Sequence, residues 1–204
     1  EQTQSVFASA EVGYRNTYYL TLTGRNDWPS QLAGPKSVQK SFFYPSVGAS
    51  VLLSEILTLP ESISYLKLRA SWASVGLPFK RFLAYPTFEW DSSTGKYSTK
   101  SAYPLYDLKP ERTDSWEVGL TVRFLKNFNL DVSFYNTKTY NQTMDTQELP
   151  TGGYSTFYAQ TGNVRNRGVE LSLGYKNTWN KFTWNTNYTF SANKNKILSL
   201  IDGY

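Results

Sequence analysis

Apolar and polar residues alternate along most of the chain with a period of two. Within residues 115–135 the apolar positions are Trp116, Val118, Leu120, Val122 and Phe124, followed by Phe128, Leu130, Val132 and Phe134. The positions between them are polar or small, and a polar break at Lys126-Asn127 separates the two runs. Because successive side chains of a strand point to opposite faces, this stretch predicts a β-hairpin with one apolar and one polar face.

The same period recurs in six further segments. They are residues 6–13, 20–25, 43–53, 66–72, 168–175 and 182–190. Together with the hairpin they predict eight antiparallel strands and an all-β, up-and-down fold. No segment has the pattern of a helix of normal length; the best candidate, residues 52–59, is short and stops at Pro60.

Short and long connections alternate between these strands. We expect tight turns at 15–17, 126–127 and 177–181 and a medium link at 54–62. We expect long loops at about 28–41, 77–110 and 145–163. A meander with this alternation gathers the tight turns at one end and the long loops at the other, as in outer-membrane barrels with short periplasmic turns and long extracellular loops.

Strand length and aromatic placement separate a membrane barrel from a soluble sandwich, which shows the same alternation with the faces exchanged. The predicted strands run to about ten to fourteen residues, whereas soluble strands average about five to six and a bilayer takes about nine to eleven. Aromatic residues near the turns suit a girdle at a lipid–water boundary. They are Tyr14, Tyr18, Phe124, Phe128, Trp179 and Phe182. On this interpretation Leu120 faces lipid, while Glu117 and Arg123 face a polar lumen.

Composition narrows the possible chemistry. The 204 residues are 40% apolar, 18% charged and 17% aromatic, which excludes a disordered chain, and no apolar run is long enough for a transmembrane helix. There is no Cys and no His, so a disulfide framework, a thiolate metal site and a Ser–His catalytic pair are excluded. The net charge is +5 with Lys and Arg scattered, which argues against nucleic acid. Glu111, Asp114 and Glu117 do not converge on an extended strand, so we expect neither an enzyme nor a cofactor.

Five blocks occur in order along the chain: YLTLTGRNDWPSQL (19–32), SFFYPSVGASVLLSE (41–55), ISYLKLRASWASVG (63–76), LKPERTDSWEVGL (108–120) and GNVRNRGVELSL (162–173). In these blocks the chain resembles the SusC/RagA family of TonB-dependent outer-membrane transporters. The resemblance implies a barrel of about 22 strands closed by a separate plug domain. Residues 1–204 would then be about eight strands of the later part of that barrel, without the plug.

The resemblance also implies a function and partners. The expected function is active import of an oligosaccharide or oligopeptide across a Gram-negative, Bacteroidetes-type outer membrane. The expected partners are a SusD-type surface lipoprotein, the TonB complex acting through other parts of the protein, the lipid bilayer and the small oligomeric substrate. Three alternatives remain open: an autonomous eight-stranded barrel acting as anchor or adhesin, a soluble carbohydrate-binding sandwich, and an outer-membrane hydrolase.

Two groups of residues are candidates for the functional site. The candidate lumen-facing residues are Arg25, Asp27, Arg69, Glu117, Arg123 and Glu170. We interpret Arg25 and Asp27 first as a structural ion pair, with a contact to the plug as the alternative. The candidate substrate or lid contacts are the loop aromatics Trp90, Tyr97, Tyr103 and Tyr154, with loop packing as the alternative. Asn166 and Gly168 suit a bulge or turn with positive φ.

Overall fold

The computed structural model describes residues 2–30, 41–77, 88–99, 111–146 and 157–199. Ten strands lie in these ranges: β1 (Thr3–Tyr14), β2 (Tyr18–Pro29), β3 (Phe42–Leu52), β4 (Ile63–Leu77), β5 (Phe88–Asp91), β6 (Lys96–Thr99), β7 (Glu111–Phe124), β8 (Phe128–Thr146), β9 (Phe157–Trp179) and β10 (Phe182–Ser199). The short helix candidate at 52–59 contains a single 3-10 turn, η2 (Leu53–Glu55). In the described part of the chain no helix is long and apolar enough to span a membrane.

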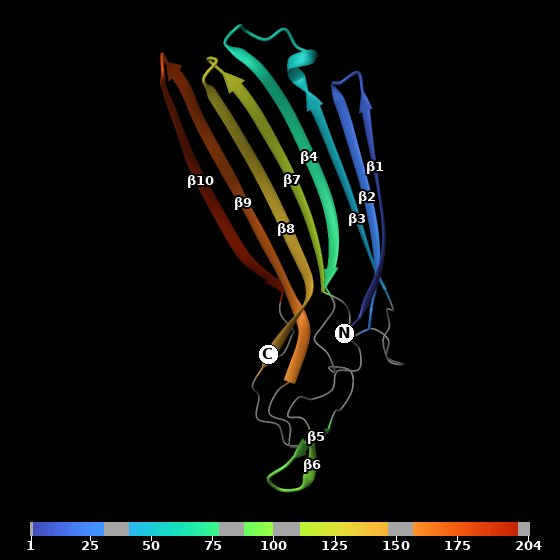
Figure 1. Cartoon of the computed structure of the whole chain (residues 1–204). Helices are drawn as coiled ribbons and strands as arrows, with labels where there is room; N and C mark the ends of the chain where they lie inside the picture. The colour runs from blue at the N-terminus through green and yellow to red at the C-terminus, as the bar shows by residue number, and fades with distance from the viewer. Residues whose placement is uncertain (1, 31–40, 78–87, 100–110, 147–156, 200–204) are drawn as a thin grey trace.

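Eight of the strands form one open antiparallel sheet in the order β1-β2-β3-β4-β7-β8-β9-β10, with β5 and β6 pairing separately as a hairpin (Figure 1). The predicted all-β, up-and-down architecture is confirmed. Strands β1 and β10 are the two edges of the sheet and are not paired with each other. The described residues therefore do not close into the eight-stranded barrel of the alternative interpretation, and both edges are left for strands of a larger barrel.

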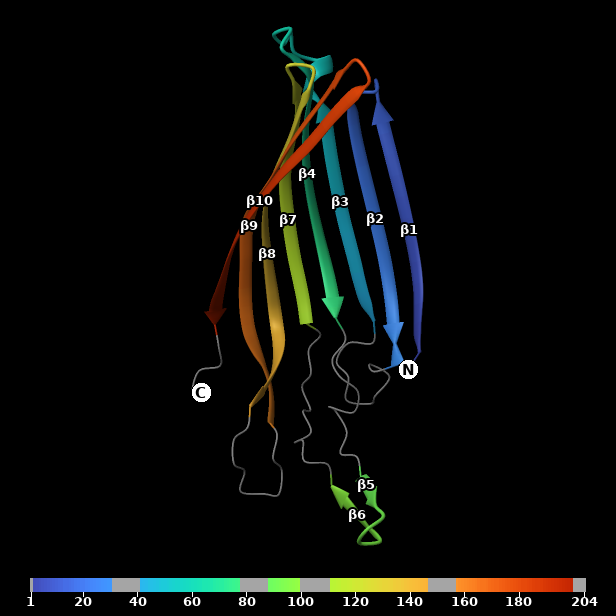
Figure 2. The same cartoon turned by 60° about the vertical axis from the view of Figure 1, so that its left-hand side comes forward.

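The tight turns gather at one end of the sheet, as predicted (Figures 1 and 2). Two of them have positive φ at both central residues, Arg15 and Asn16 in one and Leu125 and Lys126 in the other. This geometry matches the right-handed twist of the flanking strands. The third predicted turn is shorter than expected, because β9 runs to Trp179 and β10 begins at Phe182.

At the opposite end the strands are longer, and the loops shorter, than the sequence predicts. β8 has 19 residues and β9 has 23, so the ends of the predicted loop 145–163 belong to strands. The predicted loop 77–110 contains the β5–β6 hairpin, whose turn includes Gly95 with φ +63°. The sheet register continues into these extensions with irregularities near Asn141, whose φ is 55°.

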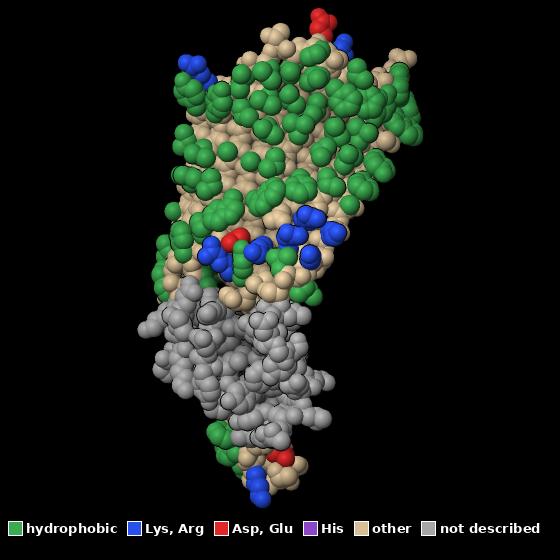
Figure 3. All heavy atoms as spheres, turned by 180° about the vertical axis from the view of Figure 1, so that it is seen from behind, with side chains coloured by type: hydrophobic (Ala, Val, Ile, Leu, Met, Phe, Trp, Pro, Cys, Tyr) green, Lys and Arg blue, Asp and Glu red, His purple; other side chains and the backbone are tan. Residues whose placement is uncertain are grey.

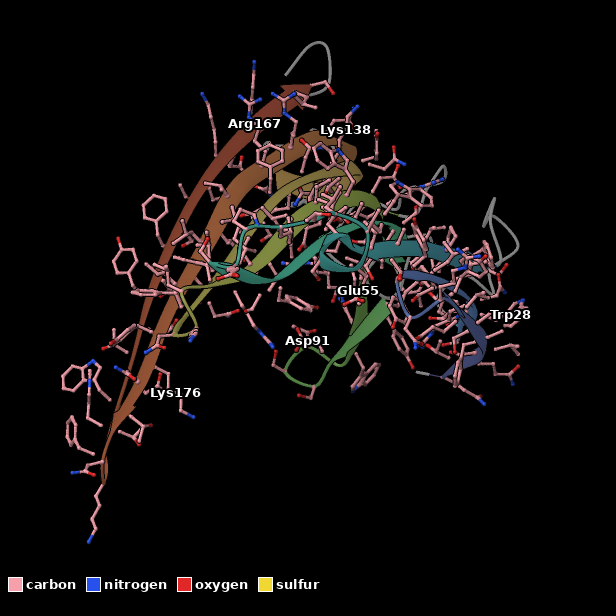
Figure 4. All side chains as sticks on the ribbon, turned by 90° about the horizontal axis from the view of Figure 1, so that it is seen from above. Trp28, Glu55, Asp91, Lys138, Arg167 and Lys176 are labelled. Atoms are coloured by element: carbon pink, nitrogen blue, oxygen red, sulfur yellow. The ribbon has the colours of Figure 1, made fainter. Side chains whose placement is uncertain are left out.

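The sheet is a curved single layer with a convex and a concave face (Figure 4). Strand register places apolar residues in rows across the convex face. One row joins Leu120, Val132, Leu171 and Phe190, and the next joins Val118, Phe134, Val169 and Ala192. Figure 3 views this face, on which hydrophobic side chains gather. Phe42 is the one buried hydrophobic residue among those described, so the sheet has no core of its own. This excludes a two-layer sandwich within the described residues.

The aromatic residues expected to form a girdle pair across the tight turns. The rings of Phe124 and Phe128 are stacked with centroids 5.3 Å apart, and Tyr175 continues the row at 4.8 Å from Phe128. The pairs Tyr14 with Tyr18 and Trp179 with Phe182 have centroids 6.3 Å apart. The register places these rings on the convex face, at the edge of its apolar surface.

Candidate functional site on the polar face

All six residues predicted to face the lumen lie on the concave face. Arg69 and Glu170 share one row, linked through Gly119 and Ser133. The other four residues occupy parallel rows of the same face. They are Arg25, Asp27, Glu117 and Arg123. The alternation in the sequence therefore groups these six side chains on one face of the sheet, and that this face lines a lumen stays a prediction.

Arg69 is the centre of a cluster of charged and hydroxyl side chains on this face. Its guanidinium donates to both carboxylate oxygens of Asp131, at 2.9 and 2.8 Å, and to the Thr121 hydroxyl at 3.0 Å. The Thr121 hydroxyl donates in turn to Asp131 at 2.6 Å, and Glu117 lies 3.7 Å from the guanidinium. Bidentate pairing of this kind fixes both the position and the orientation of the cation.

Gly119 provides the space that this cluster needs. A Cβ at that position would lie 2.5 Å from Nε and 2.7 Å from Nη2 of Arg69, so the guanidinium passes directly over the glycine to reach Asp131. The side chains of Arg69 and Asp131 are 32% and 35% exposed, so the pair stays open to water. Beside it, an open depression of about 190 Å³ is lined by Tyr19, Thr21, Gly48, Ser50, Arg69 and Glu117, among others. Charged groups and hydroxyls thus meet at a shallow hollow of the wall.

Arg25 and Asp27 form an ion pair of 2.7 Å at the loop end of β2. Asp27 is buried, and Arg25 also donates to the Ser5 hydroxyl at 3.2 Å. These contacts fit the structural interpretation, in which the two side chains neutralise each other's charge within the wall. The other two candidates lie apart from the Arg69 cluster. Arg123 stacks over the Tyr65 ring at 4.9 Å, and Glu170 makes no ion pair with any described residue.

Two of the four predicted loop contacts lie on the β5–β6 hairpin. Trp90 and Tyr97 are directly paired across it, with ring centroids 4.9 Å apart, and they are 58% and 71% exposed. Asp91 closes the turn by accepting from the Ser93 and Thr94 hydroxyls and the Ser93 N–H, which lowers the pKa of Asp91 to about 2. In Figure 4 the hairpin and Asp91 lie on the concave side of the arc. Tyr103 and Tyr154 lie outside the described residues.

Two features of the site differ from the sequence prediction. Asp131 and Thr121 complete the Arg69 cluster but were not among the candidates; the signal for them is the register of the β7–β8 hairpin, which pairs them directly. Asn166 and Gly168 form neither bulge nor turn, because β9 continues through them in regular register. Gly168 is instead required for space, since a Cβ there would lie 2.5 Å from the Ala192 carbonyl oxygen and 2.6 Å from the Tyr135 hydroxyl oxygen.

Comparison with known proteins places this sheet among larger barrels. The family model described as TonB dependent receptor-like, beta-barrel matches residues 1–203. The TonB-dependent receptors P26 and P39 of Formosa agariphila are 29% and 30% identical over 98% and 97% of this chain. The chain spans only about a fifth of the length of these curated relatives: 21% of P26 and 20% of P39.

Solved structures agree with this fold. The RagAB peptide importer in its open-open state has a TM-score of 0.82 at 22% identity, covering 99% of this chain and 22% of that one. The siderophore receptor PirA of Pseudomonas aeruginosa has a TM-score of 0.63 at 17% identity, covering 96% of this chain and 35% of that one. The copper transporter OprC has a TM-score of 0.59 at 17% identity, covering 95% and 28%.

Proposed function

Because this chain belongs to the TonB-dependent receptor β-barrel family of outer-membrane transport proteins, we propose that its sheet is part of the wall of an active importer for an oligosaccharide or oligopeptide nutrient. The observation that carries this proposal is the asymmetry of the sheet. Its convex face is apolar and suited to lipid, its concave face holds fixed charges and hydroxyls, and its two edges are open. A wall segment of a large, polar-lined barrel requires these three properties together.

The proposed orientation places the tight turns in the periplasm and the β5–β6 hairpin outside the cell. Outer-membrane barrels have short periplasmic turns and longer extracellular loops, and the distribution of turns in this sheet supports the same assignment. The extended 88–99 segment then meets substrate first. Its exposed Trp90 and Tyr97 offer ring faces that stack on sugars or pack against peptide side chains.

The Arg69 cluster would line the path that substrate takes after the plug moves. The Arg69 guanidinium, held in place by Asp131 and with Glu117 beside it, presents hydrogen-bond donors and acceptors side by side. This arrangement suits an oligomer that is rich in hydroxyl or amide groups. Thr21 and Ser50 add hydroxyls around the adjacent depression. In this proposal the concave face binds weakly and repeatedly, and no covalent chemistry takes place there.

Energy and capture would come from partners outside this chain. We assign energy to the TonB complex, acting through other parts of the protein, and capture to a SusD-type surface lipoprotein over the extracellular loops. The likeness to the RagAB peptide importer supports an assembly of that kind. Since the siderophore receptor and the copper transporter share the fold, the fold does not select between glycan and peptide.

Uptake by cells that lack or carry the intact protein tests the proposal. We expect the intact protein to support uptake of one class of labelled oligosaccharide or oligopeptide, and uptake to stop when TonB is inactivated. Replacing Trp90 and Tyr97 by Ala should weaken substrate or lid binding by about 1–3 kcal/mol, by analogy with other stacked aromatics, at an unchanged surface level of the protein. Trp184→Ala, which removes an aromatic from the convex face, is the matched control. Uptake that continues without TonB would contradict the importer.

A further inference from the structure

A group of basic side chains gathers on the convex face at its loop end, next to the hydrophobic surface (Figure 3). The register assigns to it Arg112, Lys138, Arg165, Arg167, Lys194 and Lys196, here called the basic patch, together with one carboxylate, Asp114. Four of them form two pairs with a spacing of two residues, Arg165 with Arg167 and Lys194 with Lys196, but the pairs lie far apart in the sequence. The basic patch forms because four neighbouring strands bring these residues together.

Two neighbouring rows of the sheet hold most of the patch. One row joins Asp114, Lys138, Arg165 and Lys196. The next joins Trp116, Asn136, Arg167 and Lys194. Arg165 and Arg167 thus each face a lysine directly across the β9–β10 pair. Neighbouring strands are about 4.8 Å apart, and like charges placed directly opposite each other destabilise a sheet. Such a pairing needs a counter-charge.

The described residues do not supply that counter-charge. Asp114 accepts hydrogen bonds from Arg112 Nε at 3.0 Å and from the Ser74 hydroxyl at 2.6 Å. Its negative charge is therefore already balanced by Arg112. Lys138 lies over the Tyr140 ring, with Nζ 4.7 Å from the centroid. Among the carboxylates whose side chains the structure describes, none forms an ion pair with either residue of the two Arg–Lys pairs. The described residues therefore leave these cations without a counter-charge, and an anionic ligand could supply one.

The height of the patch identifies the environment it faces. Lys138 lies ten residues along β8 from Phe128, which is in the aromatic row at the turns. At about 3.3 Å per residue and a strand tilt of about 40°, this is a rise of about 25 Å, the height of the apolar band of an outer-membrane barrel. Figure 4 shows Lys138 and Arg167 on the convex side of the arc, away from the hairpin. The patch therefore lies at the level of lipid headgroups.

We propose that the basic patch binds the phosphate groups of an acylated, phosphorylated amphiphile in the extracellular leaflet. Arg165 and Arg167 offer planar donor pairs that match phosphate oxygens, and the adjacent lysines add charge. The row of Val118 and Phe134 is next to the patch on the side of the tight turns, and this row and those beyond it receive the acyl chains. The proposal rests on the orientation given above, with the loop end outside the cell. We favour an amphiphile over free phosphate, because free phosphate would contact the cations alone and would not contact the neighbouring apolar rows.

Binding to the intact protein in detergent micelles tests this assignment. The probe is diphosphoryl lipid A, an acylated disaccharide with two phosphates, counted by native mass spectrometry; its dephosphorylated form and sodium phosphate are the comparison ligands. Each Lys or Arg near an anionic headgroup contributes about a fivefold change in affinity. The double variant Arg165→Gln with Lys196→Gln should therefore bind about 25-fold more weakly. The charge-preserving pair Arg165→Lys with Lys196→Arg should remain within a few fold of wild type.

A matched control removes two charges from the same hairpin at the other end of the membrane. Lys176→Gln with Lys181→Gln should bind lipid A as the wild type does. Equal binding by the Arg165 and Lys196 glutamine variant, equal retention of the dephosphorylated form, or displacement by millimolar phosphate would each overturn the proposal. So would loss of a dimer in that variant with lipid binding unchanged, which would assign the surface to a second copy.

Two further readouts separate this proposal from the importer. Substrate uptake should be unchanged in the Arg165 and Lys196 glutamine variant, so a protein that binds lipid A but imports nothing refutes only the importer. Labelling of Ser92→Cys by an impermeant maleimide in intact cells reports the orientation of the hairpin. Labelling only after the outer membrane is broken would place the patch in the periplasmic leaflet and overturn the assignment.

Discussion

An arginine at position 120 should destabilise the intact barrel, because Leu120 lies near the middle of the apolar band. Its row is four residues from the aromatic row of Phe128 and six from the basic row of Lys138. About 13 Å of strand at a tilt of about 40° places Leu120 about 10 Å above the turn-side boundary of a band about 25 Å tall. A guanidinium on the lipid face near the midplane costs about 2–4 kcal/mol. We expect Leu120→Arg to lower the free energy of unfolding by this amount.

The matched control places the same side chain at nearly the same height on the concave face. Ser172 is directly opposite Asp131, so an arginine there faces water and has a carboxylate neighbour. It would lose the hydrogen bond from the Ser172 hydroxyl to Asn187, 3.2 Å long and exposed. We expect a net change of less than about 1 kcal/mol. Thr121 is a poorer control, since its hydroxyl is bound to Asp131 at 2.6 Å.

Urea unfolding of the intact protein in bilayers of fixed thickness compares the two variants. Folded outer-membrane barrels migrate differently from unfolded ones on gels without heating, which gives the folded fraction at each urea concentration. A midpoint shifted for Leu120→Arg and nearly unchanged for Ser172→Arg would support the assigned facing. Equal shifts, or a larger shift for Ser172→Arg, would refute the reasoning from register to lipid exposure.

Gly119→Ala should cost about 1–2 kcal/mol in the same assay, because its Cβ would displace Arg69 from Asp131 and water would screen part of the loss. Gly48→Ala, whose Cβ comes no nearer than 3.9 Å to its neighbour, should leave the free energy of unfolding unchanged. Equal losses of stability in the two variants would show that Gly119 is not needed for the Arg69 cluster. Because the pKa of Asp91 is lowered to about 2, its contribution to the hairpin should be complete above pH 4 and should disappear as the pH falls through 2. Fluorine NMR of 5-fluorotryptophan in the intact protein would follow this, and a transition near pH 4 would contradict the assigned hydrogen bonds.

The sheet could be predicted from the sequence because alternation and tight turns determine register together. In the β7–β8 hairpin the turn after Phe124 sets the pairing, and a shift by one residue would move every apolar side chain to the wrong face. The same information places Arg69 and Glu117 on the polar face. The β5–β6 hairpin was missed because strands of four residues are too short to display a period. Its turn residues, Asp91 to Gly95, were the available signal.

Contacts between distant strands could not be predicted in the same way. Arg69 meets Asp131 across 62 residues of sequence, and the contact depends on β4 lying beside β7 and on Gly119 leaving space between them. The basic patch depends on three successive strand pairings, so an error in any one register would disperse it. Such features need the complete sheet, because no local pattern encodes which strands become neighbours.

The central claim is that one face of this sheet meets lipid and the other meets the water-filled lumen, and β8 allows it to be measured residue by residue. These 204 residues contain no cysteine, so single cysteines placed at each position from Phe128 to Lys138 can carry a spin label without competition from this part of the protein. We expect accessibility to oxygen, which concentrates in lipid, to peak at every even position as far as Phe134. Accessibility to a water-soluble nickel chelate should peak at the odd positions and then rise at Lys138. A profile without a period of two, or one in which Val132 is open to the chelate and Ser133 to oxygen, would contradict the assignment of this chain to the wall of an outer-membrane barrel.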